Sequence, residues 1–404
     1  MVTSVLRDPE SAMIAHKRAG RVGEIADFHV LQISNAARAL AQQGHDVIRM
    51  EIGEPDFSTP KPVIAAAEAA LRDSPLGYTC ALGIPELREA ISQFYASRFG
   101  VDVPADRVIV TGGSSAALLL VCALLFGRDD EVLVSDPSYP CNRQFIRTME
   151  ARAVGVPVGP ETHYQLSAGL VGQHWTERTR AVLLTTPSNP TGSLIPQASL
   201  EKVAAAVRAR EGALIVDEIY QGLVYDGPAS TALSVTSDAF VINSFSKYFN
   251  MTGWRLGWMV VPDGAQKDIE KLAQNLFICP SALAQKAALA CFTQETLEIL
   301  EYRKSQFRSR RDLLVPSLRE LGFRIPIVPG GGFYIYADSS ELASDSQAFC
   351  ADMLARTHVA FTPGIDFGSH RAREHVRFAY AAPYHKLEEA VERIELALRT
   401  AVHC

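Results

Sequence analysis

The sequence predicts an α/β protein with a large three-layer αβα domain, built on a mainly parallel sheet, and a smaller α+β domain. Two observations carry this prediction. From about residue 107 the 404-residue chain alternates short apolar runs of strand type with helical stretches, which is the pattern of a parallel sheet covered by helices on both faces. Both ends of the chain instead combine helical segments with short extended ones, as in a separate α+β unit.

Five apolar runs define the expected parallel sheet. They occupy residues 108–111, 131–135, 181–185, 213–216 and 240–243. Ligands of such sheets collect at the carboxyl ends of the strands. At or just after the end of each run come residues with functional groups or a flexible backbone, which are Gly112 to Ser115, Tyr139, Asn189, Asp217 and Lys247. We therefore expect a ligand site along this edge of the sheet.

The flanking segments predict how the chain is divided. Residues 33–43 carry apolar residues at helical spacing, and Gly44 marks the end of that helix. After Pro280 we expect a long helical stretch that reaches residue 321, then extended segments at 323–326, 332–336 and 376–380, and an amphipathic helix over 387–401. We expect three parts: an N-terminal arm and helix (1–52) that contributes to the small domain, a large ligand-binding domain (53–290) and a small C-terminal α+β domain (291–404).

Composition narrows the class of function. A net charge of -6, without strong local clustering of Lys and Arg, argues against nucleic-acid or anionic-membrane partners. The chain does not open on a basic segment followed by an apolar one, and no apolar run reaches the roughly 18 residues of a membrane span, so we expect a cytoplasmic metabolic protein. The seven cysteines are scattered without a CxxC pair, and we expect neither a metal site nor a disulfide framework.

Three residues indicate a particular cofactor. Lys247 follows a buried apolar strand, where an unpaired ammonium would be costly, and such a lysine is usually there to react. Asp217 ends the preceding strand, and Asn189 follows the strand before that. A lysine that forms an imine, a carboxylate that pairs with a ring nitrogen and an amide donor together describe a pyridoxal-phosphate site.

Motifs spread over nearly the whole chain strengthen this interpretation. Their order and spacing resemble those of the class I/II aminotransferases, a family of fold-type I pyridoxal-phosphate enzymes. The matching segments are Gly53-Glu-Pro-Asp-Phe57, Tyr78, Gly83-Ile-Pro-Glu-Leu-Arg88, Ser188-Asn-Pro-Thr-Gly192, Asp217-Glu-Ile-Tyr220, Ser244-Phe-Ser-Lys247, Thr252-Gly-Trp-Arg-Leu-Gly257, Pro363-Gly-Ile365 and Val376-Arg377.

The resemblance implies a role for each residue around the cofactor ring. Lys247 would hold the cofactor aldehyde as an imine and later move a proton between the substrate α-carbon and cofactor C4′. Asp217 would keep the pyridine nitrogen protonated, which makes the ring an electron sink. Asn189 and Tyr220 would donate to the cofactor 3′-oxygen. Tyr139 would stack on the ring, where many relatives have tryptophan.

The resemblance also implies how the cofactor phosphate is bound. Residues 113–115 follow a strand and open an apolar helix, so that free N–H groups and hydroxyls would converge on the dianion. Tyr78 would reach the phosphate of the neighbouring subunit, so that the active sites of a homodimer are shared. The expected phosphate contacts within one subunit are Gly113, Ser114, Ser115, Ser244 and Arg255.

For the substrate, Arg377 would grip the α-carboxylate through two parallel hydrogen bonds. The Gly53 backbone and Asn189 complete that end of the site. The resemblance thus predicts an aminotransferase that moves the amino group of an L-amino acid to a 2-oxo acid by ping-pong chemistry, with 2-oxoglutarate as the expected acceptor.

Other functions share this fold and cofactor. A lyase that eliminates at a C–S bond or another β-substituent is the main alternative, because the lysine, aspartate and arginine serve both chemistries. A transcription regulator is disfavoured, since the segment before Gly53 is short and not notably basic. A cofactor-binding protein without turnover would lack Lys247 or Arg377, and neither is missing. The donor side chain stays open among aspartate, alanine, aromatic and branched amino acids.

Overall fold

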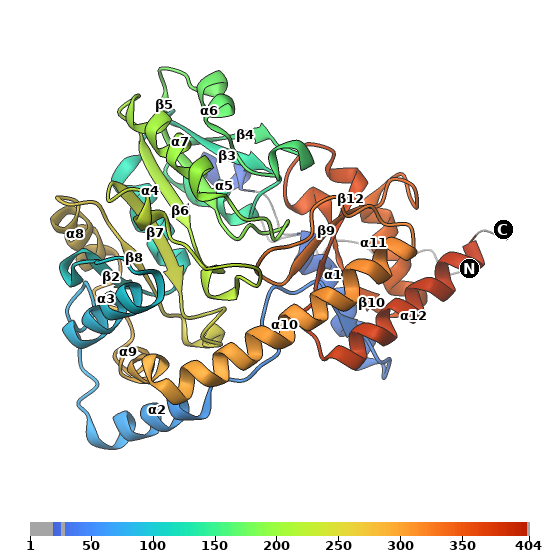
Figure 1. Ribbon diagram of the computed structural model, residues 1–404, viewed down its shortest axis with the longest axis horizontal. Helices are drawn as coiled ribbons and strands as arrows, with labels where there is room; N and C mark the ends of the chain where they lie inside the picture. Colours follow the sequence, from blue (N-terminus) through green and yellow to red (C-terminus); the bar gives the residue numbers. More distant parts are fainter. Residues whose placement is uncertain (1–18, 26–28, 402–404) are drawn as a thin grey trace.

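The chain folds around two main β-sheets, seen in a computed structural model that describes residues 19–25 and 29–401 (Figure 1). The larger sheet has seven strands in the order β2-β8-β7-β6-β5-β3-β4. Neighbouring strands are parallel, except that β8 runs antiparallel to both β2 and β7. The strands are β2 (Val108–Thr111), β3 (Glu131–Asp136), β4 (Arg152–Pro157), β5 (Thr179–Thr185), β6 (Ala213–Asp217), β7 (Ala239–Ser244) and β8 (Gly257–Val260).

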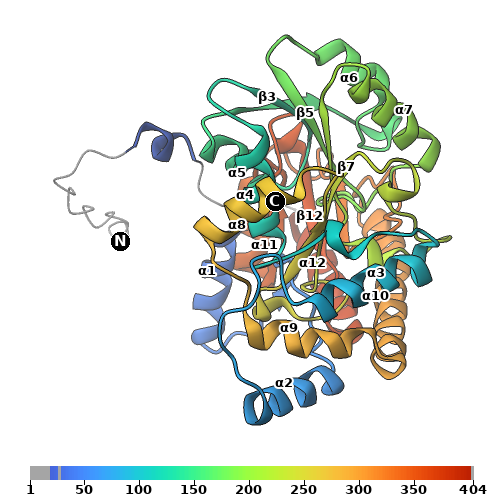
Figure 2. The ribbon, with the colours of Figure 1, turned by 90° about the vertical axis from the view of Figure 1, so that its left-hand side faces the viewer.

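Helices cover both faces of this sheet, because successive residues of each strand point to opposite sides. On β6, Ile215 packs in a core with side chains of α4, α5 and α8, whereas Leu214 and Val216 pack in the core on the side of α3, α6, α7 and α9. Figure 2 shows the sheet between these two layers. The helices are α2 (Lys61–Asp73), α3 (Pro85–Phe99), α4 (Ser114–Leu125), α5 (Pro140–Thr148), α6 (Ala168–His174), α7 (Gln197–Arg208), α8 (Gln266–Leu276) and α9 (Ala282–Ala288).

The smaller sheet comes from the last third of the chain. It has three antiparallel strands in the order β11-β12-β9, and a two-stranded parallel pair of β1 and β10 lies beside it. The long helix α10 extends from the base of the large sheet to this region (Figure 1). The elements are β1 (Ile48–Arg49), β9 (Tyr334–Asp338), β10 (Val359–Ala360), β11 (Thr362–Pro363), β12 (His375–Ala379), α1 (His29–Gln42), α10 (Gln294–Glu320), α11 (Ser346–Thr357) and α12 (Tyr384–Ala401).

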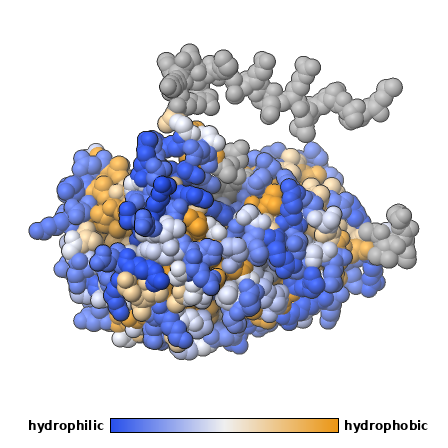
Figure 3. All heavy atoms as spheres, turned by 90° about the horizontal axis from the view of Figure 1, so that it is seen from above, coloured by the Kyte–Doolittle hydropathy of each residue, from blue (hydrophilic) through white to orange (hydrophobic). Residues whose placement is uncertain are grey.

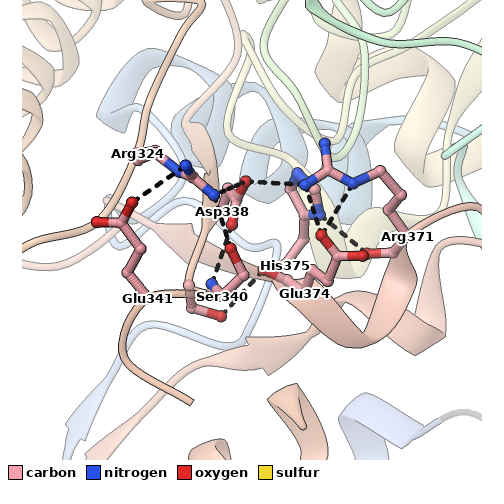
Figure 4. A network of polar contacts seen from close by, with 8 residues as sticks. Arg324, Asp338, Ser340, Glu341, Arg371, Glu374 and His375 are labelled. Carbon is pink, nitrogen blue, oxygen red and sulfur yellow. Dashed lines mark hydrogen bonds and ion pairs between the residues drawn. The ribbon is translucent and has the colours of Figure 1, made fainter. Parts of the chain in front are cut away.

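A network of hydrogen bonds and ion pairs stabilises one end of the smaller sheet (Figure 4). Asp338, the last residue of β9, accepts hydrogen bonds from Arg324 and Arg371 at 3.2 and 3.1 Å. Arg371 also pairs with Glu374, directly before β12. The network ties β9 to the segment after α10 and to the turn before β12.

The structure confirms the predicted fold class and all five predicted strands, whose ends differ by at most two residues. Two strands of the large sheet were not predicted. β4 is an edge strand with mostly accessible residues, so its sequence lacks a clear apolar run. β8 directly follows the Thr-Gly-Trp-Arg motif, and this part of the sequence was interpreted only for its binding chemistry.

The expected helical stretch after Pro280 is interrupted, which corrects the prediction of one long helix. α9 and α10 are separate, because Thr293 adopts an extended conformation and its side chain accepts a hydrogen bond from Thr296 N, which caps α10. The expected extended segment 323–326 forms only an isolated bridge at Arg324, and the segment 332–336 becomes a strand only from Tyr334. The first 18 residues of the expected N-terminal arm lie outside the described residues.

Within the described ranges, every helix is too short or too polar to cross a membrane. In the view of Figure 3 the coloured surface is mainly hydrophilic, with hydrophobic residues in scattered groups.

Candidate active site

A cavity of about 390 Å³ lies where the carboxyl ends of the large-sheet strands meet the smaller sheet and α1. This is the edge at which the sequence predicted a ligand site. Ten of the predicted site residues line the cavity, although they come from segments far apart in the chain. They are Gly53, Ser114, Ser115, Tyr139, Asn189, Asp217, Tyr220, Lys247, Arg255 and Arg377.

Lys247 projects from the turn after β7. Its Nζ donates a 2.6 Å hydrogen bond to the backbone oxygen of Gly53. Burial lowers the pKa of Lys247 to about 8, since the ammonium loses its hydration, and the nearby cations Arg255 and Arg377 act in the same direction. About a tenth of this amine is therefore uncharged at pH 7 and available as a nucleophile, far more than for an ordinary lysine.

Asp217 ends β6 on the same edge. It is buried, and Oδ1 accepts a hydrogen bond of 3.1 Å from Ile219 N. Burial raises the pKa of Asp217 to about 7, although the Ile219 N–H and the charge of Lys247 oppose the shift. A buried carboxylate of this kind calls for a cationic partner, and the protonated ring nitrogen of a pyridine cofactor is such a partner.

Arg377 and Asn189 meet at the other end of the cavity. Arg377 Nη1 donates to Asn189 Oδ1 at 2.9 Å, and Nη2 donates to the Glu51 backbone oxygen at 2.6 Å. The Nε donor of Arg377 is buried and has no hydrogen-bond partner among the described residues. A buried donor without a partner is costly, so this guanidinium suits a carboxylate ligand in the cavity.

Tyr220 lies beside these residues and is buried, with its hydroxyl 2.8 Å from the hydroxyl of Tyr334. Its ring centroid is 6.0 Å from Lys247 Nζ. Burial raises the pKa of Tyr220 well above its usual value. The phenol therefore stays protonated at neutral pH and retains a hydrogen to donate.

The turn between β2 and α4 forms a cradle for an anion. Gly113 has a φ of +85°, and a Cβ built on it would lie 2.9 Å from Arg255 Nη2. A Cβ on Gly257 would lie 2.8 Å from Ser114 N. The two glycines thus let the guanidinium and the first N–H groups of α4 approach one point, which fits a phosphate group at a helix N-terminus.

Three predicted residues lie outside the cavity lining. Gly113 shapes the turn through its backbone, as described above. Ser244 is buried behind the lining, where its hydroxyl donates to Ser246 Oγ at 2.9 Å. Tyr78 is 85% exposed and lies away from the cavity of its own chain, as expected for a residue that acts in a neighbouring subunit.

Several lining residues were not predicted from the sequence. Tyr334 contacts the position of Gly53 with its hydroxyl and the Arg377 guanidinium with its ring. Glu51 is buried, and its Oε2 has no hydrogen-bond partner in the part of the chain that the structure describes. The exposed Arg38 of α1 and the buried Asp366 also line the cavity. Tyr334 sits in a strand whose apolar pattern signals only burial, and Glu51 alternates with Arg49 in the segment 48–52, so neither residue carried a clear signal of a ligand site.

A reactive lysine, a strand-end carboxylate and a glycine-built phosphate cradle at this edge of an αβα sheet define a fold-type I pyridoxal-phosphate enzyme. The chain matches the family described as Aminotransferase class I and II over residues 45–394. It belongs to this family.

Known proteins similar to the whole chain are also aminotransferases. The chain is 40% identical to the valine–pyruvate aminotransferase of Mycobacterium tuberculosis over 372 residues, which cover 92% of this chain and 96% of the relative. A crystal structure of an aminotransferase from Mycobacterium tuberculosis matches with a TM-score of 0.92 and 40% identity, covering 95% of this chain and all of that chain. The aspartate aminotransferase of Thermus thermophilus with maleate matches with a TM-score of 0.89 and 31% identity, covering 94% and 99% of the two chains.

The predicted activity is thereby confirmed at the level of the reaction. The protein is an aminotransferase that uses pyridoxal 5′-phosphate and acts on small-molecule amino and 2-oxo acids.

Proposed function

We propose that the enzyme transfers the amino group of an aliphatic, valine-like L-amino acid to a 2-oxo acid. When bound, the cofactor supplies the electron sink for the reaction. Lys247 Nζ would move the proton at the substrate α-carbon, and Asp217 would hold the charge on the ring nitrogen. Asn189 and Tyr220 would fix the ring through its 3′-oxygen, and Tyr139 would cover one face of the ring.

Separate groups of residues would hold the cofactor phosphate and the substrate α-carboxylate. Arg255 and the turn after β2 would hold the phosphate, and Ser244 would support that end through Ser246. Arg377 would orient the α-carboxylate with its free donor, while the Gly53 oxygen positions Lys247. The observation that carries the assignment is the convergence of Lys247, Asp217 and Arg377 on one cavity.

An apolar wall supports a valine-like donor. Val30 and Leu31 of α1, together with Ile52, Pro140 and Phe367, line the same cavity. A branched aliphatic side chain against such a wall loses contact with water, which stabilises the complex by roughly 1.5–3 kcal/mol for full burial. The valine–pyruvate aminotransferase named above gives independent support for this donor.

For the acceptor, 2-oxoglutarate remains the predicted 2-oxo acid. The exposed Arg38 lines the cavity, and its guanidinium forms no ion pair within the described part of the chain. Such a cation suits the distal carboxylate of a dicarboxylic acid. Pyruvate, which lacks that carboxylate, is the acceptor that the named relative suggests.

Steady-state kinetics with L-valine and either acceptor test this proposal. Arg38→Leu should raise the KM for 2-oxoglutarate roughly two- to fivefold, as expected for the loss of an exposed ion pair, and leave the KM for pyruvate unchanged. Arg208→Leu, which removes an exposed arginine of α7 that also forms no ion pair within the described residues, is the matched control. Equal effects of Arg38→Leu on both acceptors would exclude Arg38 as the group that recognises the second carboxylate. Release of ammonia without an acceptor would instead favour the lyase alternative.

We also propose a homodimer with shared active sites. Tyr78 is the aromatic residue that would enter the neighbouring site, and other exposed apolar residues belong to its own loop and to the end of α8. They are Leu76, Leu276, Phe277 and Ile278. The two segments are adjacent, since Thr79 N donates to Cys279 Sγ at 3.4 Å. An exposed apolar surface of this kind is typical of a subunit contact.

We propose that the chain forms a large domain over residues 53–290 and a small domain over residues 291–404, to which residues 1–52 contribute. The parallel pairing of β1 with β10 supports the joining of the N-terminal segment to the C-terminal part. A cytoplasmic location likewise remains a proposal, supported by the metabolic class of the enzyme.

A further inference from the structure

We propose that Tyr334 is a positioning residue that links the group holding the cofactor 3′-oxygen to the group holding the substrate carboxylate. This inference rests on the roles proposed above for Tyr220 and Arg377. It adds a residue that the sequence did not single out, and it assigns separate tasks to the hydroxyl and to the ring of that residue.

The contacts of Tyr334 are unusual for a strand residue. It begins β9, is only 1% exposed and still lines the cavity. Its hydroxyl lies 2.8 Å from the Tyr220 hydroxyl, and its ring centroid lies 4.4 Å from the Arg377 guanidinium carbon. A Cβ on Gly53 would lie 2.1 Å from the Tyr334 hydroxyl oxygen, so only glycine leaves room for it there.

Hydrogen counting fixes the direction of the bond between the two phenols. Each tyrosine has one hydrogen to donate. If Tyr220 donates its hydrogen to the cofactor 3′-oxygen, then Tyr334 must be the donor in the 2.8 Å bond. A phenol oxygen that accepts a hydrogen bond becomes a stronger donor itself, because hydrogen bonds in a chain polarise one another. Tyr334 would thereby strengthen the bond from Tyr220 to the cofactor.

The ring of Tyr334 acts on the substrate side. The guanidinium of Arg377 lies against this ring and also against Phe367, at 4.4 and 4.7 Å from the two ring centroids. Aromatic faces attract a desolvated cation and restrict its plane. Arg377 is further held at its two Nη atoms by Asn189 and the Glu51 oxygen. The ring of Tyr334 thus helps to hold Arg377 in a defined orientation.

Two substitutions separate these tasks. Tyr334→Phe removes only the hydroxyl, whereas Tyr334→Leu removes the hydroxyl and the aromatic face. Tyr336→Phe is the matched control, because Tyr336 lies on the same strand and its buried hydroxyl has no partner among the described residues. Tyr220→Phe is the positive control for the 3′-oxygen contact.

The first measurement is an absorbance titration of the cofactor-loaded enzyme against pH. A hydrogen bond donated to the 3′-oxygen stabilises its anionic form, and therefore lowers the pH at the midpoint of the absorbance change. Tyr334→Phe should therefore raise the midpoint by about half a unit to one unit, in the same direction as Tyr220→Phe, and Tyr336→Phe should not move it.

The second measurement is the binding of a carboxylate inhibitor, such as maleate, to the same loaded proteins. Tyr334→Leu should weaken binding roughly threefold or more, and Tyr334→Phe should weaken it less than twofold. An unchanged midpoint in Tyr334→Phe, with a shift in Tyr220→Phe, would overturn the inference and leave the proposed function intact. An unchanged midpoint in Tyr220→Phe would show that the assigned role of Tyr220 is wrong, and the inference would fall with it.

Discussion

Lys247 owes its reactivity to where the chain places it. The turn after β7 removes the amine from bulk water, and the Gly53 oxygen holds Nζ at 2.6 Å. Asp217 is desolvated at the end of the neighbouring strand, where the pairing of β6 with β7 fixes it. Burial at the same edge of the sheet therefore shifts both residues: it lowers the pKa of Lys247 and raises the pKa of Asp217.

Cofactor capture by the apoprotein should depend on pH. The neutral amine is the nucleophile, and the pKa of Lys247 is about 8, below the usual value for lysine. The neutral fraction, and with it the rate of capture, should therefore rise about tenfold between pH 7 and pH 9 and then level off. Stopped-flow absorbance measures this rate. The Lys247→Ala protein should form no borohydride-reducible link at any pH, and a reducible link in that variant would refute the assignment of Lys247.

Asp217→Asn should separate binding from chemistry. The amide fills the same space and should leave the cofactor bound, but it cannot hold a positive charge on the ring nitrogen. The half-reaction with an amino acid should slow by several orders of magnitude. Single-turnover absorbance measures the rate, and near-normal turnover would mean that the carboxylate is only structural.

Among the elements, the turn from β2 into α4 depends on the neighbouring strand β8. Gly257 starts β8 and packs against the backbone of Gly113 and Ser114, so the close approach of two strands shapes the phosphate cradle. The phosphate cradle therefore needs a glycine at position 257, although Gly257 does not itself line the cavity.

Gly257→Ala should weaken cofactor retention. Its Cβ would lie 2.8 Å from Gly113 C and from Ser114 N, so the turn must shift away from the phosphate position. The dissociation constant for the cofactor, measured by fluorescence titration of the apoprotein, should rise roughly tenfold or more. Gly253→Ala is the control, because its Cβ would meet no atom within 4 Å. Equal retention in the two variants would show that the turn does not hold the phosphate.

At this scale the sequence predicted most of the fold, because the strands of a buried parallel sheet are continuous apolar runs. It failed at β4, whose accessible edge residues carry no such pattern, and at β8, whose residues directly continue the Thr252–Gly257 motif and were interpreted only as part of it. In the site it identified the residues within recognisable motifs. It did not identify Tyr334 or Arg38, since their importance comes from tertiary contacts with residues distant in the chain.

For the whole molecule, the proposed homodimer would make assembly part of the mechanism, because the exposed Tyr78 would act in the neighbouring subunit. Each site would take its lysine from one subunit and its tyrosine from the other. The activity of a mixed dimer then depends on which of its two sites each substitution affects.

A dimer of one Tyr78→Phe subunit and one Lys247→Ala subunit should keep one native site. If the sites are shared, both substitutions affect the same site. The other site then contains an unchanged Lys247 and an unchanged Tyr78. Isolation with two affinity tags and a half-reaction assay measure the result, and about half of the wild-type amplitude is expected. If the mixed dimer is no more active than an impaired Tyr78→Phe homodimer, each site is built from a single chain.

The central claim is that this site exchanges an amino group with a valine-like donor, and a half-reaction tests it most directly. The loaded enzyme is mixed with L-valine in the absence of any 2-oxo acid, and its absorbance spectrum is followed. We expect complete conversion to the pyridoxamine form, release of one 2-oxo acid per site, and return of the original spectrum when 2-oxoglutarate or pyruvate is added. A spectrum that stays unchanged with L-valine but converts with L-aspartate would contradict the proposed donor, and continuous release of ammonia would contradict the proposed exchange.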